Sequence, residues 1–181
     1  MTCIAAFVQD GAVWMGADST GVGGYDLTVR ADQKIFRNGE MLFGFMSSFR
    51  MGQLLRHALT IPDHDPRVDD EKYLTVTFID AVRECLKGKG WARKNNEQEA
   101  GGTFLIGYRG RLFQVEDDYQ VGIATDGFDA CGCGGQIAKG ALFASTHLKG
   151  EARVEMALKA AERFSAGVRG PFHITCLEAK S

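Results

Sequence analysis

The sequence lacks the features that mark several large classes of protein. No apolar run approaches the ~20 residues that a membrane-spanning helix needs. The formal net charge is only −2, which gives no electrostatic case for binding nucleic acid or an anionic membrane. The first residues also lack the basic segment and small-residue cleavage site of a signal peptide. We therefore expect a cytoplasmic protein with no nucleic-acid and no membrane partner.

The sequence also lacks an even set of cysteines. Its five are Cys3, Cys85, Cys131, Cys133 and Cys176. An odd number without a secretion signal argues against a disulfide framework. Zinc sites usually space their cysteines by two to four residues and need two more ligands, whereas Cys131 and Cys133 flank one glycine and no histidine follows with ligand-like spacing. We expect buried, reduced thiols, no metal and no cofactor.

The composition is that of an ordinary soluble protein. Hydrophobic residues make up 45% of the chain and charged residues 24%. A length of 181 residues predicts a single domain that spans residues 1–181. A chain of this size buries roughly 70% of the surface that its unfolded form exposes, so a sizeable core is available.

The stretch that organises the chain begins at Thr2. This residue follows Met1, so removal of the methionine would leave a free N-terminal threonine. Such a residue carries a nucleophile, its hydroxyl, and a base, its α-amine, on one backbone unit. The ordinary pKa of an α-amine is about 7.7–8.0, near neutrality, which suits a general base. Thr2 is therefore a candidate catalytic nucleophile.

The expected strands connect Thr2 to two charged residues. Residues 2–8 form an apolar, strand-like run, Asp10-Gly11 is a strong hairpin turn, and the returning strand 12–17 leads into Asp18. The hairpin can bring Thr2 and Asp18 close together. A further connection leads to Lys34, which two apolar residues follow.

These segments resemble the N-terminal part of proteasome β subunits and of the bacterial HslV peptidase, the threonine-type N-terminal nucleophile (Ntn) hydrolases. In that family an acid lies sixteen residues after the threonine and a lysine thirty-two residues after it. Here the separations are 18 − 2 = 16 for Asp18 and 34 − 2 = 32 for Lys34. The resemblance covers nearly the whole chain and is weakest over residues 61–100.

The resemblance implies a mechanism. The Thr2 hydroxyl would attack a peptide carbonyl, and the free α-amine would accept its proton. Lys34 would lower the pKa of that amine by like-charge repulsion and favour the developing alkoxide. Asp18 would pair with Lys34 and hold it in position. The plain structural alternative is an ion pair between strands with no catalytic role.

The resemblance also implies supporting residues. A backbone N–H of Ser47 or Ser48 would form the oxyanion hole, where many family members have glycine. Phe45 and Met46 lie where the family builds the wall of its specificity pocket. Their bulk indicates an apolar pocket, although packing in the core is an equal alternative.

Two positions depart from the family pattern. The Gly-Ser-Gly turn of the family is here Gly132-Cys133-Gly134, and a thiol is a poorer hydrogen-bond partner than a hydroxyl. Phe164 stands where proteasome subunits commonly have an aspartate. Ser165 is the candidate to keep part of that role beside the N-terminal amine.

The hydrophobic pattern predicts the order strands, two helices, strands, two helices, strand. Further strands are expected over 27–36, 41–46, 103–108, 112–115, 119–123 and 172–177. Helices are expected after the N-cap hydroxyls of Ser47 and Ser48, from Asp69, over 135–143 and over 151–164. Residues 20–26 and 88–102 are expected to be loops. Two sheets with a helix pair on each outer face would bury every element, which is also the α+β, four-layer αββα sandwich that the resemblance implies.

Three functions remain open from the sequence. The leading hypothesis is a threonine peptidase that self-associates into a ring and cleaves peptides or unfolded proteins. An unfoldase ATPase partner is implied by analogy only. The first alternative is an Ntn amidohydrolase with a small amide substrate, and the second is a non-catalytic ring subunit. Retention of Thr2, Asp18 and Lys34 together argues against the second.

Overall fold

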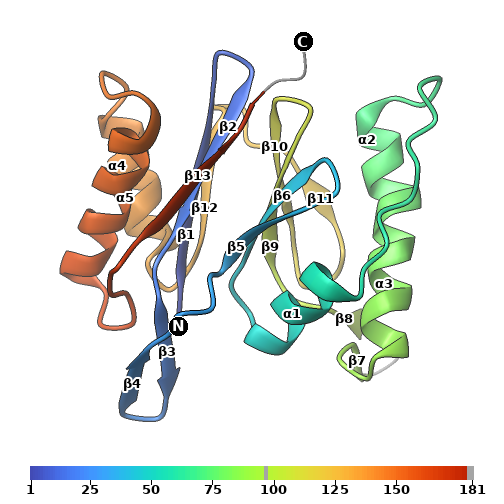
Figure 1. The fold of residues 1–181 in the computed structure, drawn as a ribbon, viewed down its shortest axis with the longest axis horizontal. Helices are drawn as coiled ribbons and strands as arrows, with labels where there is room; N and C mark the ends of the chain where they lie inside the picture. The colour runs from blue at the N-terminus through green and yellow to red at the C-terminus, as the bar shows by residue number, and fades with distance from the viewer. Residues whose placement is uncertain (96–97, 179–181) are drawn as a thin grey trace.

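The computed structural model describes residues 1–95 and 98–178. Its first large sheet is antiparallel, with the strand order β12-β1-β2-β13. These strands are β1 (Cys3–Gln9), β2 (Ala12–Ala17), β12 (Phe128–Gly132) and β13 (His173–Leu177). Helices α4 (Gly135–Ala144) and α5 (Gly150–Phe164) lie along the outer face of this sheet (Figure 1).

The second large sheet is also antiparallel and has the order β11-β10-β9-β6-β5. Its strands are β5 (Ile35–Asn38), β6 (Met41–Phe45), β9 (Phe104–Tyr108), β10 (Arg111–Val115) and β11 (Val121–Gly122). Helix α1 (Phe49–His57) and a second helical stretch lie on its outer side (Figure 1). That stretch runs through α2 (Asp70–Lys72), the π-helical turn η1 (Tyr73–Phe78) and α3 (Ile79–Gly88).

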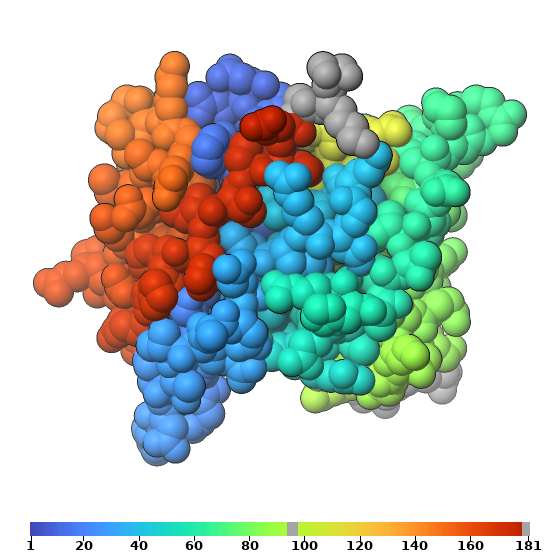
Figure 2. Space-filling model, in the orientation of Figure 1, coloured from blue at the N-terminus to red at the C-terminus, as the bar shows by residue number. Residues whose placement is uncertain are grey.

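Two hairpins complete the described fold. One consists of β3 (Thr20–Gly23) and β4 (Asp26–Val29), and the other of β7 (Arg93–Asn95) and β8 (Gln98–Ala100). The β3–β4 hairpin projects from the body of the molecule in the space-filling view (Figure 2). None of the described helices is long and apolar enough to cross a membrane.

The first hairpin forms as its turn residues predict. Asp10 and Gly11 both have positive φ, 51° and 75°, as a two-residue turn between twisted strands requires. The resulting register pairs Ile4 with Ala17, and the Asp18 N–H donates to the Cys3 carbonyl at 3.2 Å. The turn at one end of the hairpin thus sets the distance between Thr2 and Asp18 at the other.

The strand pattern differs from the expected one in several places, among them β12, a strand that the sequence did not predict and that pairs with β1. Residues 20–26, expected as a loop, form β3 and the turn into β4. The strand expected over 27–36 is broken by bends at 31–34, where the chain crosses from the hairpin to the second sheet. The strand expected over 119–123 shrinks to β11, because Tyr119 has a φ of 69° and cannot continue an extended segment.

The loop expected over 88–102 also needs correction, whereas the helix expected from Asp69 is confirmed. The loop contains β7 and β8, while its residues 96–97 lie outside the described part of the chain. The helical stretch begins at Asp70 with Asp69 as its N-cap, and its β-branched residues Thr75, Val76 and Thr77 lie in the π-helical turn. The other three helices lie within one or two residues of their expected positions.

Candidate active site

A buried ion pair lies at the centre of the candidate site. Lys34 Nζ donates to Asp18 Oδ1 at 2.8 Å, and the two side chains are 1% and 0% exposed. The same carboxylate accepts the N–H of Cys3 at 2.8 Å and that of Thr20 at 2.9 Å. Because the end of β2 and two backbone donors fix Asp18, the lysine that it binds is held in one place.

Burial and pairing act on Lys34 in opposite directions. Removal from water disfavours the ammonium and lowers the pKa of Lys34, while the negative charge of Asp18 raises it; burial has the larger effect. The pair also joins two sheets, because Asp18 follows β2 and Lys34 precedes β5. A cation is therefore held inside the protein at the junction of the two sheets.

The structure brings Thr2 to this pair, as the sequence predicts. Thr2 is 4% exposed, and its hydroxyl donates to the Met1 carbonyl at 2.5 Å. Lys34 Nζ donates to the same carbonyl oxygen at 3.4 Å. The hydroxyl and the ammonium can therefore act on one carbonyl group.

The predicted partners of the Thr2 nitrogen also lie beside it. The Thr2 N–H donates to Cys133 Sγ at 3.4 Å, and the Ser165 hydroxyl donates to the same sulfur at 3.5 Å. Cys133 is exposed, and Cys85 and Cys176 are only half-buried, so the expectation that all five thiols are buried holds for Cys3 and Cys131 alone. Phe164 is 76% exposed and leaves the position beside the nitrogen to Cys133 and Ser165.

Glycine is required on both sides of Cys133. Gly132 has a φ of +97°, and a Cβ there would overlap the Thr2 carbonyl oxygen. A Cβ on Gly134 would lie 2.9 Å from Ala161 Cβ and 3.0 Å from Cys3 Cβ. The turn can follow Thr2 this closely only because neither glycine has a side chain.

A cavity of about 580 Å³ opens beside Thr2. All four residues predicted for the oxyanion hole and pocket wall line it: Phe45, Met46, Ser47 and Ser48. Phe45 is also 4% exposed and packed in the core, so both sequence interpretations hold for it.

The two serines have different roles. Ser48 Oγ caps α1 by accepting the N–H of Arg50 at 3.1 Å, whereas Ser47 Oγ accepts the N–H of Thr103 at 2.8 Å. Within the described residues the backbone N–H groups of Ser47 and Ser48 donate to no other group. Both remain candidates for the oxyanion hole.

Sequence reasoning missed one wall of the cavity and part of another. The β3–β4 hairpin contributes Gly21, Val22, Gly23, Asp26 and Thr28, and Arg30 and Phe49 complete the set. The alternation of Asp26, Thr28 and Arg30 is a period-two signal for one face of a strand. This signal could have identified strand β4, but the glycines that precede it indicated a loop.

Two other thiols, those of Cys3 and Cys131, are buried in the core. Burial raises the pKa of Cys3 to about 12 and that of Cys131 well above its ordinary value. All five cysteines are free. Residues 1–95 and 98–178 contain no group of three or more side chains that could hold a metal ion.

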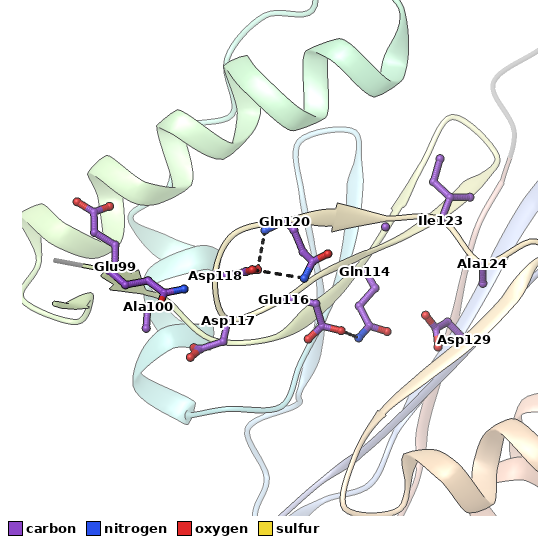
Figure 3. A pocket seen from close by; sticks show the side chains of 12 residues that line it. Glu99, Ala100, Gln114, Glu116, Asp117, Asp118, Gln120, Ile123, Ala124 and Asp129 are labelled. Atoms are coloured by element: carbon purple, nitrogen blue, oxygen red, sulfur yellow. Dashed lines mark hydrogen bonds between the residues drawn. The ribbon is translucent and has the colours of Figure 1, made fainter. Parts of the chain in front are cut away.

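A larger cavity, of about 640 Å³, lies away from Thr2 between β10, β11 and the start of β12 (Figure 3). Five of its lining residues are acidic: Glu99, Glu116, Asp117, Asp118 and Asp129. Asp129 pairs with Lys139 at 2.6 Å and Glu99 with Arg83 at 2.9 Å. Among the described residues that line it there is no serine, threonine, cysteine or lysine, so the cavity at Thr2 remains the candidate active site.

The similarity of the chain to known proteins lies in its structure. No family model matches the sequence, and no curated protein matches it either. Solved structures do match. BPH from Thiobacillus denitrificans superposes with a TM-score of 0.83 at 21% identity, covering 99% of each chain. A second structure of that protein is a complex with epoxomicin, with a TM-score of 0.82.

Two further structures extend the likeness. HslV from Trypanosoma brucei has a TM-score of 0.66 at 18% identity and covers 98% of this chain and 99% of its own. Anbu from Hyphomicrobium sp. has a TM-score of 0.68 at 19% identity and covers 98% of this chain and 82% of its own. This chain has the fold of the HslV and Anbu proteins. At these identities the likeness concerns the fold alone.

Proposed function

We propose that the chain is a threonine peptidase of the Ntn type, with residues 1–181 as one αββα domain. The carrying observation is that the Thr2 hydroxyl and the Lys34 ammonium reach one carbonyl oxygen, that of Met1. A nucleophile and a cation that converge on a carbonyl are the parts that acyl transfer needs. The likeness to HslV and Anbu supports the same reaction class.

Removal of Met1 frees the base. The α-amine of Thr2 then accepts the hydroxyl proton while Oγ1 attacks the substrate carbonyl carbon. The new C–O bond forms, the C–N bond breaks, and the leaving amine takes the proton from the Thr2 ammonium. The same amine next activates a water molecule, which hydrolyses the ester and restores the hydroxyl.

Lys34, Asp18 and the turn at Cys133 support these steps. The Lys34 ammonium repels a proton on the nearby amine, which lowers the pKa of the amine and keeps the base neutral. Its charge also stabilises the oxygen of Thr2 as the proton leaves. Asp18 holds the ammonium in position, and Cys133 with Ser165 orients the amine.

The oxyanion that forms during attack needs donors of its own. The backbone N–H groups of Ser47 and Ser48 lie at the cavity wall and are not committed elsewhere in the described chain. One such donor typically contributes about 10²–10³ in rate.

We further propose that the protein self-associates into a ring and acts on peptides or unfolded chains. A lone subunit would leave the 580 Å³ cavity open to folded proteins. Light scattering at micromolar concentration tests the assembly, and a pure monomer would favour a small-amide hydrolase instead. An unfoldase ATPase is proposed as a partner only by analogy with the family that the chain resembles.

The deciding experiment compares wild type with Thr2→Ala on a panel of fluorogenic peptides, with the intact mass of each sample. We expect the active protein to lack Met1, and we expect Thr2→Ala to lose hydrolysis while its melting temperature stays close to that of wild type. Thr2→Ser retains a hydroxyl and serves as the matched control. Unchanged turnover in Thr2→Ala would place the active site elsewhere. Epoxomicin, present in one similar structure, is the first inhibitor to try.

A further inference from the structure

The cavity at Thr2 shares two lining residues with a second, smaller chamber. This chamber has a volume of about 110 Å³, and Phe45 and Phe49 line both spaces. The other residues around the chamber are Asp32, Gln33, Gly52, Gln53, Arg56 and His57. The two phenylalanines therefore form a partition between the candidate active site and an adjoining space.

The two rings differ in how firmly they are held by the core. Phe45 is 4% exposed, and its ring lies so close to Gly52 that a Cβ there would overlap it. Phe49 is the first residue of α1 and only partly buried, with its ring edge-on to Phe45 at 5.6 Å between centroids. Phe49 is thus the part of the partition that the core fixes least.

Two cations flank the Phe49 ring. The Arg30 guanidinium stacks over it at 3.8 Å from the centroid, and Lys34 Nζ lies 5.8 Å from the same centroid. Arg30 is itself held by Asp32, which accepts from Nε at 2.7 Å and from Nη2 at 2.6 Å. The ring is therefore clamped next to the proposed catalytic lysine.

The same contacts decide the chemistry of the wall. Phe45, Met46 and Phe49 are apolar, and the charge of Arg30 is already matched by Asp32. Asp26, a carboxylate that also lines the cavity, belongs to the β3–β4 hairpin and not to this wall. A substrate side chain that reaches this wall gains from apolar contact. Its size is limited, because the space behind the wall is closed off by Phe49.

We propose that Phe49, clamped by Arg30, sets the upper size limit for the substrate side chain whose carbonyl is attacked. The site then prefers small and medium apolar side chains, such as alanine, valine and leucine, over aromatic ones. Phe49 is a specificity-determining residue and Arg30 a positioning residue. This inference rests on the proposed function.

The test measures kcat/KM for peptides that carry alanine, leucine, phenylalanine or tryptophan before the scissile bond. Phe49→Ala joins the chamber to the site, so the ratio of tryptophan to leucine turnover should rise roughly 10-fold or more, as for other pocket-size changes. Phe49→Leu, which keeps most of the volume and protects the fold, should raise it less. Phe143→Ala, the same change at a 71% exposed position on α4, should leave the ratio unchanged.

Arg30→Ala provides a second variant. It releases the ring without removing it, so the ratio of the KM for the tryptophan peptide to the KM for the leucine peptide should fall. A purely structural role for Arg30 would change the melting temperature and leave the substrate ratio constant, which would contradict the positioning role.

The outcomes separate the two proposals. Thr2-dependent turnover with the same substrate ratio in wild type, Phe49→Ala and Phe49→Leu overturns this inference and leaves the proposed function intact. Absence of Thr2-dependent turnover for every peptide overturns the proposed function and this inference with it.

Discussion

The helix-covered faces of the two large sheets are packed with very different side chains. Between α4, α5 and the first sheet the core consists largely of small residues: Cys3, Ala5, Ala130, Ala138, Ala157 and Ala161. Between α1, α3 and the second sheet it is rich in aromatic residues, among them Phe36, Phe43, Phe45, Phe78, Phe104 and Phe113. Small side chains allow close approach of backbones, whereas aromatic rings fill wide spaces.

Each kind of packing fits a different part of the site. The small-residue half lets the start of α4 approach β1, so that Cys133 reaches the Thr2 nitrogen. The aromatic half ends in Phe45 and Phe49, which form the cavity wall. We infer that the first half positions the nucleophile and the second half selects the substrate. Asp18 and Lys34 join the two.

The largest effect on turnover is expected at the Asp18–Lys34 pair, where the small-residue half and the aromatic half meet. Lys34→Ala removes the cation, so kcat should fall by roughly 10²–10⁴, the usual range for lost acid–base or electrostatic assistance. It also leaves the buried Asp18 carboxylate without its counter-charge, with only the N–H groups of Cys3 and Thr20 as donors, which should lower the free energy of unfolding by about 3–5 kcal/mol. Turnover and melting temperature measured on the same samples separate the two effects.

Controls and pH sharpen this test. Lys34→Arg keeps the charge but changes the geometry, so it should also be impaired. In Lys34→Ala the pKa of the Thr2 amine should rise, so the limb of the pH–rate profile that reports the base should move to higher pH. Normal turnover per folded molecule in Lys34→Ala would reduce the pair to a structural one.

Lys34 also makes stability depend on pH. Burial lowers the pKa of folded Lys34 below its ordinary 10.5, so the unfolded chain binds more protons in the interval between the two values. The stability of wild type relative to Lys34→Met should therefore rise with pH through that interval. Thermal melts of both proteins at a series of alkaline pH values test this rise. Melting temperatures that change in parallel with pH in the two proteins would contradict it.

A pair of glycine substitutions separates the two halves. Gly132→Ala pushes a methyl group against the Thr2 carbonyl, so we expect kcat to fall by about 10²-fold, as when a reacting group is displaced by 1 Å. Gly52→Ala pushes the same group against the Phe45 ring, so substrate selectivity and KM should change with less effect on kcat.

Steady-state kinetics of both variants on the leucine and tryptophan peptides provide the comparison. Circular dichroism serves as the check on folding. If the two glycine variants lost kcat equally and kept the selectivity of wild type, the assignment of nucleophile positioning to one half and substrate selection to the other would be wrong.

The sequence predicts the nucleophile half of the site better than the substrate half. Thr2 and Asp18 are joined by a hairpin with a strong local turn signal, so their meeting follows from a short-range pattern. Lys34 was assigned from its spacing in the family resemblance, because the β3–β4 hairpin that separates it from Asp18 was not predicted. The two supports at Cys133 and Ser165 came from the family resemblance, since they lie more than 130 residues from Thr2. Long-range contacts of this kind leave no periodic signal.

The sequence did not predict elements whose residues have a low intrinsic propensity for the structure that they adopt. Strand β12 contains Asp129, Ala130 and Gly132, which have low strand propensity, and it forms because β1 needs a second neighbour. The glycines before β4 concealed the hairpin that lines the cavity. Arg30 and Phe49 come from a bend and a helix start, and only the fold brings them together.

The smallest effect is expected at Cys133. Cys133→Ser replaces a weak hydrogen-bond partner of the Thr2 amine with a stronger one, so kcat should rise a few-fold, or about 1 kcal/mol. Cys133→Ala should lower it by a similar factor, and Cys85→Ser on α3 is the matched thiol control. The order serine, cysteine, alanine in kcat checks the role, and equal values would remove Cys133 from the site.

A trapped acyl-enzyme decides whether Thr2 is the nucleophile. Acid quenching during turnover of a slowly hydrolysed peptide ester, followed by peptide mapping in a mass spectrometer, locates the acyl group. We predict a mass increase on the N-terminal peptide that starts at Thr2, and none in Thr2→Ala. Cys133 provides the sharpest alternative, because its exposed thiol lies 3.4 Å from the Thr2 nitrogen. An acyl group on Cys133, or on any residue other than Thr2, would contradict the proposed mechanism.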